Sequence, residues 1–200
     1  MTDLFEDKAA EWDARPLPAI ISEGVGRALL EHVELTPDMQ VMDFGAGTGL
    51  ICCHVAPHVA KIYAVDISEA MLEQLAAKPE LQGKVEPVCR DILEAALEEK
   101  VDLIISAMAL HHVEHTDRLL KAFAQQLAPG GKLALADLDA EDGSFHPADI
   151  EGVYHAGFDR DELGALLEAN GFEDVQFVTA AEVEKNGRHY PIFLLTATKR

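Results

Sequence analysis

Three alternate glycines follow a short apolar run near residue 45, a pattern typical of a loop that cradles a ligand. The run Val41–Phe44 leads into Gly45, Gly47 and Gly49, and a helical pattern begins at Leu50. Glycine lets the backbone turn tightly and lets a ligand approach closely, because no Cβ intervenes. Taken alone, the G-x-G-x-G spacing is also consistent with a simple tight turn between a strand and a helix.

Two carboxylates are placed to complete a nucleotide-type site around this loop. Asp66 ends the next apolar run, 17 residues after Gly49. A carboxylate at that place can accept hydrogen bonds from both hydroxyls of a ribose. Asp43 lies two residues before the first glycine, where a diphosphate would meet a negative charge. A nicotinamide dinucleotide is therefore the less favoured ligand, because its pyrophosphate prefers a G-x-G-x-x-G loop and a positive helix end.

Histidines are the main candidates for proton transfer. His111 and His112 follow the fourth apolar run, where ligands meet the carboxyl edge of an open α/β sheet, and His146 follows the fifth. Helix capping or packing is the alternative role for each. A metal site is a weaker possibility, because only His111 and His115 have the spacing of one helix face. The side chains that could converge on an ion are His111, His115, His146 and His155 with Asp137 or Asp139. We expect no metal site.

Apolar runs alternate with helical patterns along the chain, which predicts βαβ units in a mainly parallel sheet. The predicted strands are Val41–Phe44, Ile62–Val65, Val85–Cys89, Val101–Ala107 and Lys132–Leu138. The helical patterns between them are Leu50–Ala60, Ser68–Lys78, Ile92–Lys100 and Thr116–Leu127. Parallel strands end at one edge of the sheet, so the glycine loop, Asp66 and His111 should lie along the same edge.

The two ends of the chain complete the predicted fold. Before the first strand we expect a helix over Ala19–Leu35 and a shorter amphipathic piece over Leu4–Trp12. After the fifth, the predicted elements are a helix from Asp159 to Asn170, strands over Val175–Thr179 and Ile192–Thr198, and a hairpin turn at Asn186-Gly187. The expected fold is α/β and Rossmann-like, with a mainly parallel seven-stranded sheet, helices on both faces and an antiparallel C-terminal strand. Residues 1–200 should form one domain.

Charge and composition limit the kinds of partner and the compartment that we expect for this protein. The 200 residues include 16 Lys and Arg against 36 Asp and Glu, a net charge of −20. This charge disfavours nucleic acid and anionic membrane surfaces. Residues 1–13 are acidic where a secretory signal would be basic and then apolar. Three cysteines are too few for a disulfide framework. We expect a cytoplasmic protein without nucleic-acid or membrane partners, and the sequence carries no signal of its oligomeric state.

Together these segments resemble the class I S-adenosylmethionine-dependent methyltransferases, of the small-molecule type that includes the quinone-biosynthesis C-methyltransferases. The matching segments are Phe5–Asp13 (the segment that closes over the cofactor), Val41–Gly49 (the first motif), Asp66 (the ribose-binding acid), Cys89–Ile92 (flanking the adenine), Val101–Val113 (the fourth strand and its active-site edge) and Leu127–Leu133 (the turn into the fifth strand). They occur in the family's order and cover the chain from Phe5 to about Leu138. The C-terminal third matches only in broad outline.

The resemblance implies S-adenosylmethionine as cofactor and S-adenosylhomocysteine as product. The ammonium and sulfonium groups of this cofactor favour nearby carboxylates, which agrees with Asp43 and Asp66. The implied cofactor contacts are Trp12, Asp43, Gly45, Ala46, Gly47, Thr48, Gly49, Asp66, Ile67, Met71, Asp91, Ile92, Ser106 and Ala107. Residues 1–36 would form N-terminal helices and a lid. His111 is the candidate catalytic base, and a substrate-side insertion over residues 139–158 would contribute His146, Tyr154 and His155.

Methyl transfer to a small-molecule acceptor, by in-line displacement at carbon, nitrogen or oxygen, is the expected function. A non-catalytic S-adenosylmethionine-binding sensor or subunit is the main alternative, since it would need the same cofactor residues. Protein methylation is a third possibility, because the negative charge suits basic peptides, but nothing in the sequence places a groove for them. The insertion after the fifth strand is long enough to build an acceptor pocket, which favours an enzyme.

Overall fold

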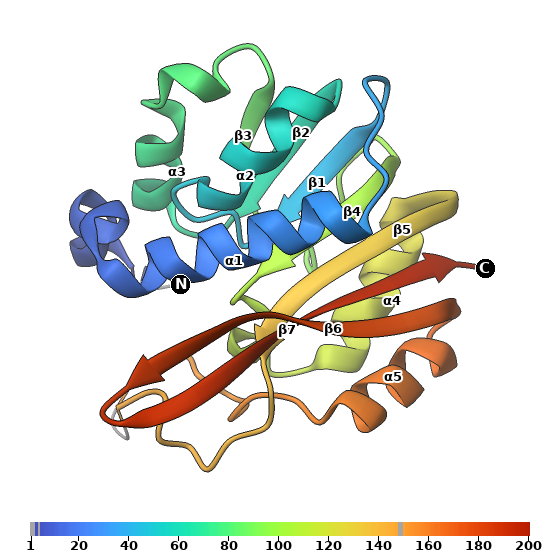
Figure 1. Cartoon of the computed structure of the whole chain (residues 1–200). Helices are drawn as coiled ribbons and strands as arrows, with labels where there is room; N and C mark the ends of the chain where they lie inside the picture. The colour runs from blue at the N-terminus through green and yellow to red at the C-terminus, as the bar shows by residue number, and fades with distance from the viewer. Residues whose placement is uncertain (1–2, 4, 148–149) are drawn as a thin grey trace.

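The computed structural model describes residues 3, 5–147 and 150–200, and it has one twisted sheet with helices on both faces (Figure 1). The strands are β1 (Gln40–Phe44), β2 (Lys61–Asp66), β3 (Val85–Cys89), β4 (Val101–Ala107), β5 (Leu127–Leu138), β6 (Phe172–Lys185) and β7 (Arg188–Lys199). Their order in the sheet is β3-β2-β1-β4-β5-β7-β6. The first five strands pair in parallel, and β7 runs antiparallel to both β5 and β6. The predicted architecture is confirmed.

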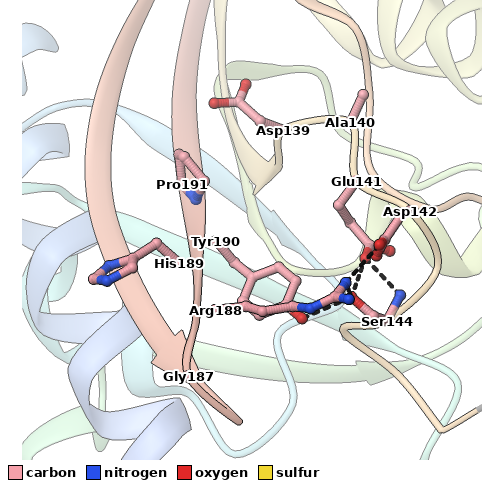
Figure 2. A pocket seen from close by; sticks show the side chains of 10 residues that line it. All are labelled: Asp139, Ala140, Glu141, Asp142, Ser144, Gly187, Arg188, His189, Tyr190 and Pro191. Atoms are coloured by element: carbon pink, nitrogen blue, oxygen red, sulfur yellow. Dashed lines mark hydrogen bonds and ion pairs between the residues drawn. The ribbon is translucent and has the colours of Figure 1, made fainter.

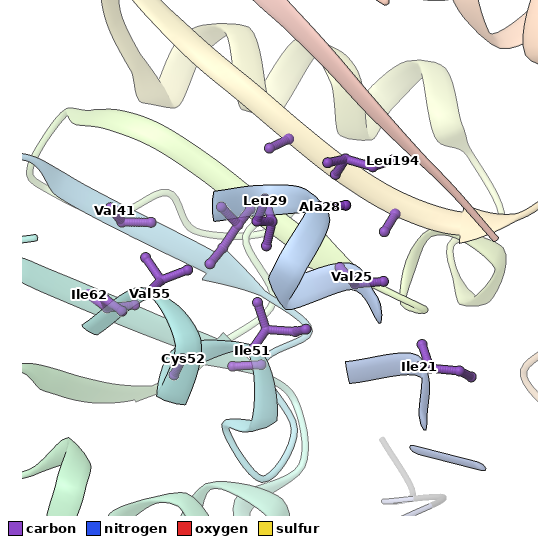
Figure 3. Packing of buried hydrophobic residues seen from close by; sticks show 14 of the residues in the cluster. Ile21, Val25, Ala28, Leu29, Val41, Ile51, Cys52, Val55, Ile62 and Leu194 are labelled. Atoms are coloured by element: carbon purple, nitrogen blue, oxygen red, sulfur yellow. The ribbon is translucent and has the colours of Figure 1, made fainter. Parts of the chain in front are cut away.

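Helices cover both faces of this sheet. They are α1 (Pro16–His32), α2 (Leu50–Val55), α3 (Glu69–Ala76), α4 (Thr116–Gln126) and α5 (Arg160–Ala169). Residues of α1, α2 and α3 share one buried cluster, and residues of α4 and α5 share the other. Side chains alternate between the faces along each strand, so Val41 packs with α1 and α2 (Figure 3). Its neighbour Met42 belongs to the opposite cluster. Strands covered on both sides must be apolar at nearly every position, which explains their continuous apolar runs.

Two predicted helices differ in extent. Helix α1 begins at Pro16, three residues before the predicted start, because proline is well suited to the first helical turn. It ends at His32, and Val33 is already extended. The predicted helix over Leu50–Ala60 becomes α2 followed by a short 3₁₀ turn, Ala56–His58, which contains a proline that has no N–H to donate.

The predicted helix over Ile92–Lys100 is wrong: this segment is irregular. The side chain of Asp91 accepts a hydrogen bond from the Leu93 amide at 2.8 Å, which forms a local turn. The Leu97 amide donates to the Gln126 side chain of α4 at 3.0 Å, so this amide makes its hydrogen bond outside the segment and not to a carbonyl of a helix within it. The apolar residues of this stretch still pack into the core on the α4 side, which produced the helix-like spacing.

The C-terminal hairpin is longer than predicted. Strands β6 and β7 pair from Phe172 with Lys199 to Lys185 with Arg188, so all but two of the dozen residues expected between two short strands belong to the strands themselves. The two-residue turn is Asn186-Gly187, as predicted, and both residues have positive φ. The hairpin projects beyond the other strands (Figure 1).

The N-terminal segment lies outside the sheet as a 3₁₀ helix, η1 (Glu6–Ala14). Leu4, the first residue of the predicted amphipathic piece, and residues 148 and 149 of the predicted insertion lie outside the described residues. Within residues 3, 5–147 and 150–200, every helix is too short or too polar to cross a bilayer.

Candidate active site

The glycine loop joins β1 to α2 and is held by backbone hydrogen bonds. Gly45, Gly47 and Gly49 have φ of +67°, +54° and +81°, a region that residues with a Cβ rarely adopt. The Gly45 amide donates to the carbonyl of Val65 at 2.9 Å, and the Gly47 amide donates to Asp66 Oδ2 at 2.7 Å. The loop is therefore fastened to the end of β2 through both backbone and side chain.

Asp66 ends β2 and is available for a ligand hydroxyl. Its Oδ2 accepts from Gly47 N–H, and its Oδ1 accepts from Ser68 N–H at 2.9 Å. Burial raises the pKa of Asp66, and these backbone hydrogen bonds oppose that effect. Each carboxylate oxygen has a second lone pair, so both can accept a further hydrogen bond. The next residue, Ile67, is 54% exposed and offers apolar surface beside the carboxylate.

Asp43 lies beneath the loop rather than on its surface. The residue is 1% exposed, and the Cys52 Sγ–H of α2 donates to Asp43 Oδ2 at 3.1 Å. Burial raises the pKa of Asp43 to about 7, with the hydrogen bond from Cys52 opposing the shift and the charge of Asp66 adding to it. A positively charged ligand above the loop would favour the ionised carboxylate.

The N-terminal segment is tied to the loop and to α3 by two carboxylates. Asp13 accepts a hydrogen bond from Thr48 Oγ1 at 2.5 Å, and its other oxygen lies 2.6 Å from the Lys78 ammonium. Asp3 accepts from Ser68 Oγ at 2.7 Å. Both ends of η1 are thus fastened beside Asp66 and the glycine loop, the position that the sequence predicts for a lid.

Aromatic contacts link this segment to the histidines. The Trp12 ring lies edge-on to Phe5 with centroids 5.8 Å apart, and Phe5 lies edge-on to His112 at 5.5 Å. Trp12 is therefore linked to His112 through Phe5, which the sequence did not single out, and its role as a cofactor contact stays a prediction.

The other predicted cofactor residues follow the carboxyl ends of the strands, but several of their side chains serve the fold. Ser106 Oγ donates to the Phe44 carbonyl at 2.8 Å, and Asp91 caps its own turn. Met71 and Ile92 are buried, and Ala107 is half-buried at the end of β4. Their roles as cofactor contacts stay predictions.

His111 and Asp137 form a buried pair where β4 and β5 end. His111 Nδ1 lies 2.7 Å from Asp137 Oδ1, and the two side chains are 1% and 0% exposed. The backbone amide of His111 also donates to Asp137 Oδ2 at 3.2 Å, and that of Leu138 to Oδ1 at 2.8 Å. Because the carboxylate accepts, Nδ1 of His111 carries a hydrogen, and in the neutral imidazole Nε2 therefore carries the lone pair.

Two further imidazoles surround this pair. His146 Nε2 lies 3.2 Å from His111 Nε2, and the His112 ring is 4.2 Å from that of His111 between centroids. His112 is held by the Gly152 carbonyl, 2.6 Å from its Nδ1. Burial lowers the pKa of His112 and lowers that of His146 to about 4, with the neighbouring histidines adding to both effects. We call His111, His112 and His146 the histidine cluster.

Tyr154 and His155 are placed differently from each other. The backbone amide of Tyr154 donates to the His111 carbonyl at 2.9 Å, and its side chain is 55% exposed. His155 Nε2 lies 2.9 Å from the Val113 carbonyl and 3.3 Å from Thr116 Oγ1. His155 therefore joins its segment to the start of α4, whereas the Tyr154 side chain is exposed, and their roles as substrate contacts stay predictions.

Among the described residues, no three or more His, Cys, Asp or Glu side chains are arranged to hold a metal ion. A hollow of about 350 Å³ lies between residues 139–144 and the start of β7 (Figure 2). Arg188 contacts Asp142 at 2.5 Å and Ser144 at 2.8 Å there, and Tyr190 contacts the same serine at 2.8 Å. Its charged groups are paired with neighbours, and the predicted cofactor residues lie elsewhere. The contacts around the hollow hold residues 139–146 against the start of β7.

The main functional residue that we did not predict from the sequence is Asp137, in its role as the hydrogen-bond partner of His111. Its position gives a usable signal, because a carboxylate near the carboxyl end of the fifth strand lies beside the end of the fourth. The contacts that Asp3 and Asp13 make with Ser68, Thr48 and Lys78 could not be predicted in this way, because the five acidic residues among the first 13 look equivalent in the sequence.

Comparison with known proteins places the chain among methyltransferases. A family model described as a methyltransferase domain matches residues 15–177. An uncharacterized methyltransferase of Schizosaccharomyces pombe is 26% identical over 161 residues, covering 72% of this chain and 57% of that protein. Trans-aconitate 2-methyltransferase of Pseudomonas aeruginosa is 30% identical over 139 residues, covering 68% and 50%. The chain thus spans about half the length of these curated relatives.

The fold is shared with solved methyltransferases. The N-methyltransferase NodS of Bradyrhizobium japonicum, in complex with S-adenosyl-L-homocysteine, superposes with a TM-score of 0.74 at 16% identity, covering 98% of this chain and 94% of that one. The mainly parallel sheet with its antiparallel C-terminal strands is thus a methyltransferase fold. The chain belongs to the methyltransferase-domain family.

The residues present fit S-adenosylmethionine. Asp66 has oxygen lone pairs to spare, Ile67 exposes an apolar side chain next to it, and a Cβ on Gly47 would meet no atom within 4 Å. The carboxylates around the loop suit a ligand that carries an ammonium and a sulfonium.

Replacing Asp66 by alanine should weaken S-adenosylmethionine binding by about 1–3 kcal/mol, because the ribose hydroxyls would lose their charged acceptor. Isothermal titration calorimetry measures this change. Glu173→Ala is the matched control, since this residue is exposed, lies opposite Thr198 in the β6–β7 register near the amino ends of the parallel strands, and pairs its carboxylate with Arg200. Equal affinity in a folded Asp66→Ala protein would show that the carboxylate does not bind the ribose.

The buried carboxyl of Asp43 should make stability fall as pH rises. The unfolded chain releases this proton near the ordinary value of 3.8, whereas the folded chain keeps it to about pH 7. Stability is therefore lost between about pH 4 and pH 7 and stays lost above. The Asp43→Asn protein should lack this component and gain at least about 1 kcal/mol over wild type at pH 8 relative to pH 4. Urea unfolding at a series of pH values measures the difference, and parallel curves for the two proteins would contradict it.

Proposed function

We propose that the protein transfers a methyl group from S-adenosylmethionine to a small-molecule acceptor, with His111 as the base that receives the acceptor's proton. The observation that carries this proposal is the buried pair of His111 and Asp137 beside the glycine loop. Ala109, two residues before His111, lies so close to the loop that a Cβ on Gly45 would be 2.3 Å from the Ala109 Cβ. Cofactor loop and base are therefore neighbours.

Each part of the chain has a distinct task in this account. S-adenosylmethionine supplies an activated methyl group when it is bound. The glycine loop and Asp66 hold and orient the cofactor, while η1, fastened through Asp3 and Asp13, covers the site and excludes water. Asp137 orients the His111 imidazole and stabilises the positive charge that His111 gains with the proton.

The acceptor we infer is a small molecule that is not a polyanion. The N-terminal segment contacts His112 through Phe5 and so occupies one side of the histidine cluster, which favours a compact acceptor over a polymer. One relative is named for trans-aconitate, a tricarboxylate. The net charge of −20 here would repel such a substrate, as it would nucleic acid.

A sensor or non-catalytic subunit would share the cofactor residues but has no use for a buried base. The two functions are separated by incubating the protein with S-adenosylmethionine labelled in its methyl group and with pooled phenols, amines, thiols and carboxylic acids. We expect label in one acceptor class and release of S-adenosylhomocysteine. Binding of the cofactor without transfer to any pool would contradict an enzyme of this kind and favour the sensor.

A further inference from the structure

The hydrogen bonds around His111 determine which nitrogen of His146 is basic. Neutral His111 donates from Nδ1 to Asp137, so in this form its Nε2 has no hydrogen and can only accept. His146 Nε2 lies 3.2 Å from that atom. One of two nitrogens at this distance must donate, so His146 carries its hydrogen on Nε2. In the neutral cluster, the lone pair of His146 is therefore on Nδ1.

We propose that His146 is a second catalytic residue, whose Nδ1 takes the proton from the acceptor and whose Nε2 passes a proton to His111. This inference rests on the proposed function. The acceptor's bond to hydrogen breaks and its electron pair stays on the acceptor, while a new N–H bond forms at His146 Nδ1. The Nε2–H bond of His146 breaks as an N–H bond forms at His111 Nε2. The net result is a neutral His146 and a positively charged His111 beside Asp137.

The surroundings explain why the charge ends on His111. Asp137 contacts His111 directly at 2.7 Å, so it stabilises the charged imidazole there. Around His146 the charged and titratable groups are His111, His112 and Lys185, which oppose a positive charge, and Asp137, which favours one from farther away. Burial and these neighbours lower the pKa of His146 to about 4, so His146 conducts the proton without retaining it.

His146 is held in place by its neighbours in the chain. Phe145 is 3% exposed and packs edge-on against Tyr190, with ring centroids 5.1 Å apart. Its amide donates to Glu141 Oε2 at 3.0 Å, and its carbonyl accepts from the Lys185 ammonium. The Tyr190 hydroxyl contacts Ser144 at the hollow described above (Figure 2). The projecting part of the β6–β7 hairpin thus positions a residue of the active site.

This arrangement also selects a class of acceptor. A carboxylate has already lost its proton at neutral pH and needs no base. A neutral hydroxyl must release a proton before or as it gains a methyl group, and an amine that is protonated at neutral pH must release one to expose its lone pair. The relay therefore indicates an acceptor with an O–H or N–H group.

The tautomers can be measured directly in the intact protein. Long-range ¹H–¹⁵N spectra of the histidine-labelled wild type, with and without S-adenosylhomocysteine, report which ring nitrogen carries each hydrogen. Signals are assigned with His146→Gln and His111→Gln. We expect hydrogen on Nδ1 of His111 and on Nε2 of His146. Hydrogen on Nδ1 of His146, or coordination of equimolar Zn²⁺ by the two Nε2 atoms, would overturn the relay.

A kinetic test uses phenol, benzylamine and benzoate as probe acceptors. His146→Ala should reduce transfer to the O–H or N–H probe by about 10²-fold, and added imidazole should restore part of the rate. The S-adenosylmethionine KM should not change. Undiminished transfer in His146→Ala, or preference for benzoate, would overturn the relay. If the wild type methylates neither these probes nor the pooled acceptors, the proposed function fails, and the tautomer spectra still decide the proton arrangement.

Discussion

Replacing His111 by glutamine should lower the rate of methyl transfer by about 10²- to 10⁴-fold, the range that a positioned base contributes. Glutamine can still donate a hydrogen bond to Asp137, so the buried carboxylate keeps a partner. It has no basic nitrogen, however, and the acceptor's proton would have to leave for water. Affinity for S-adenosylmethionine should be unchanged, because the ties that hold the cofactor loop do not pass through this side chain. The rate is measured with the acceptor found in the transfer screen, and the affinity by calorimetry.

The control for this experiment is His189→Gln. His189 lies near the tip of the hairpin, and its side chain is 64% exposed and paired with Glu182. The same chemical change there should leave transfer intact. Wild-type rates in a folded His111→Gln protein would remove this histidine from the mechanism, and a parallel loss of cofactor affinity would point to a structural role.

Replacing Gly45 by alanine should destabilise the protein by about 2–5 kcal/mol, with two independent contributions. The first is the backbone, because φ of +67° costs a residue with a Cβ about 1–2 kcal/mol. The second is steric: the new Cβ would lie 2.3 Å from the Ala109 Cβ, so β1 or the segment after β4 must move. Urea unfolding measures the total, and the displaced Ala109 should also weaken cofactor binding.

Gly47→Ala separates these two contributions. Gly47 has a similar φ, +54°, but a Cβ there would meet no atom within 4 Å. It should therefore lose only the backbone contribution of about 1–2 kcal/mol. Equal losses at Gly45 and Gly47 would show that the close approach of Ala109 does not constrain the loop.

Local patterns allowed most of the fold to be predicted. The glycine loop, the acid at the end of β2 and the Asn186-Gly187 turn are each specified by residues adjacent in sequence. The predicted helix over Ile92–Lys100 was wrong because a contact between residues far apart in the sequence determines the backbone there. Apolar spacing reports which residues are buried, whereas the Leu97 hydrogen bond to Gln126, 29 residues away, directs the backbone out of a helix.

The meeting of Asp137 and His146 with His111, which the sequence raised only as a weak metal-site alternative, depends on contacts between distant segments. Asp137 meets His111 because β4 and β5 are neighbours in parallel register, with Ala107 beside Ala136. His146 reaches the same place because the far end of a long hairpin supports its segment. The identity of the acceptor, including the quinone-type acceptor suggested by resemblance, stays a prediction, because one scaffold serves many acceptors.

The most direct test of the account is calorimetric titration of the purified protein with S-adenosylmethionine and S-adenosylhomocysteine, with NAD as the control ligand. We expect that both adenosyl compounds bind one site, that Asp66→Ala weakens both, and that NAD does not bind. A folded protein that binds neither adenosyl compound, or that binds NAD in their place, would contradict the assignment of the glycine loop and with it the proposed reaction.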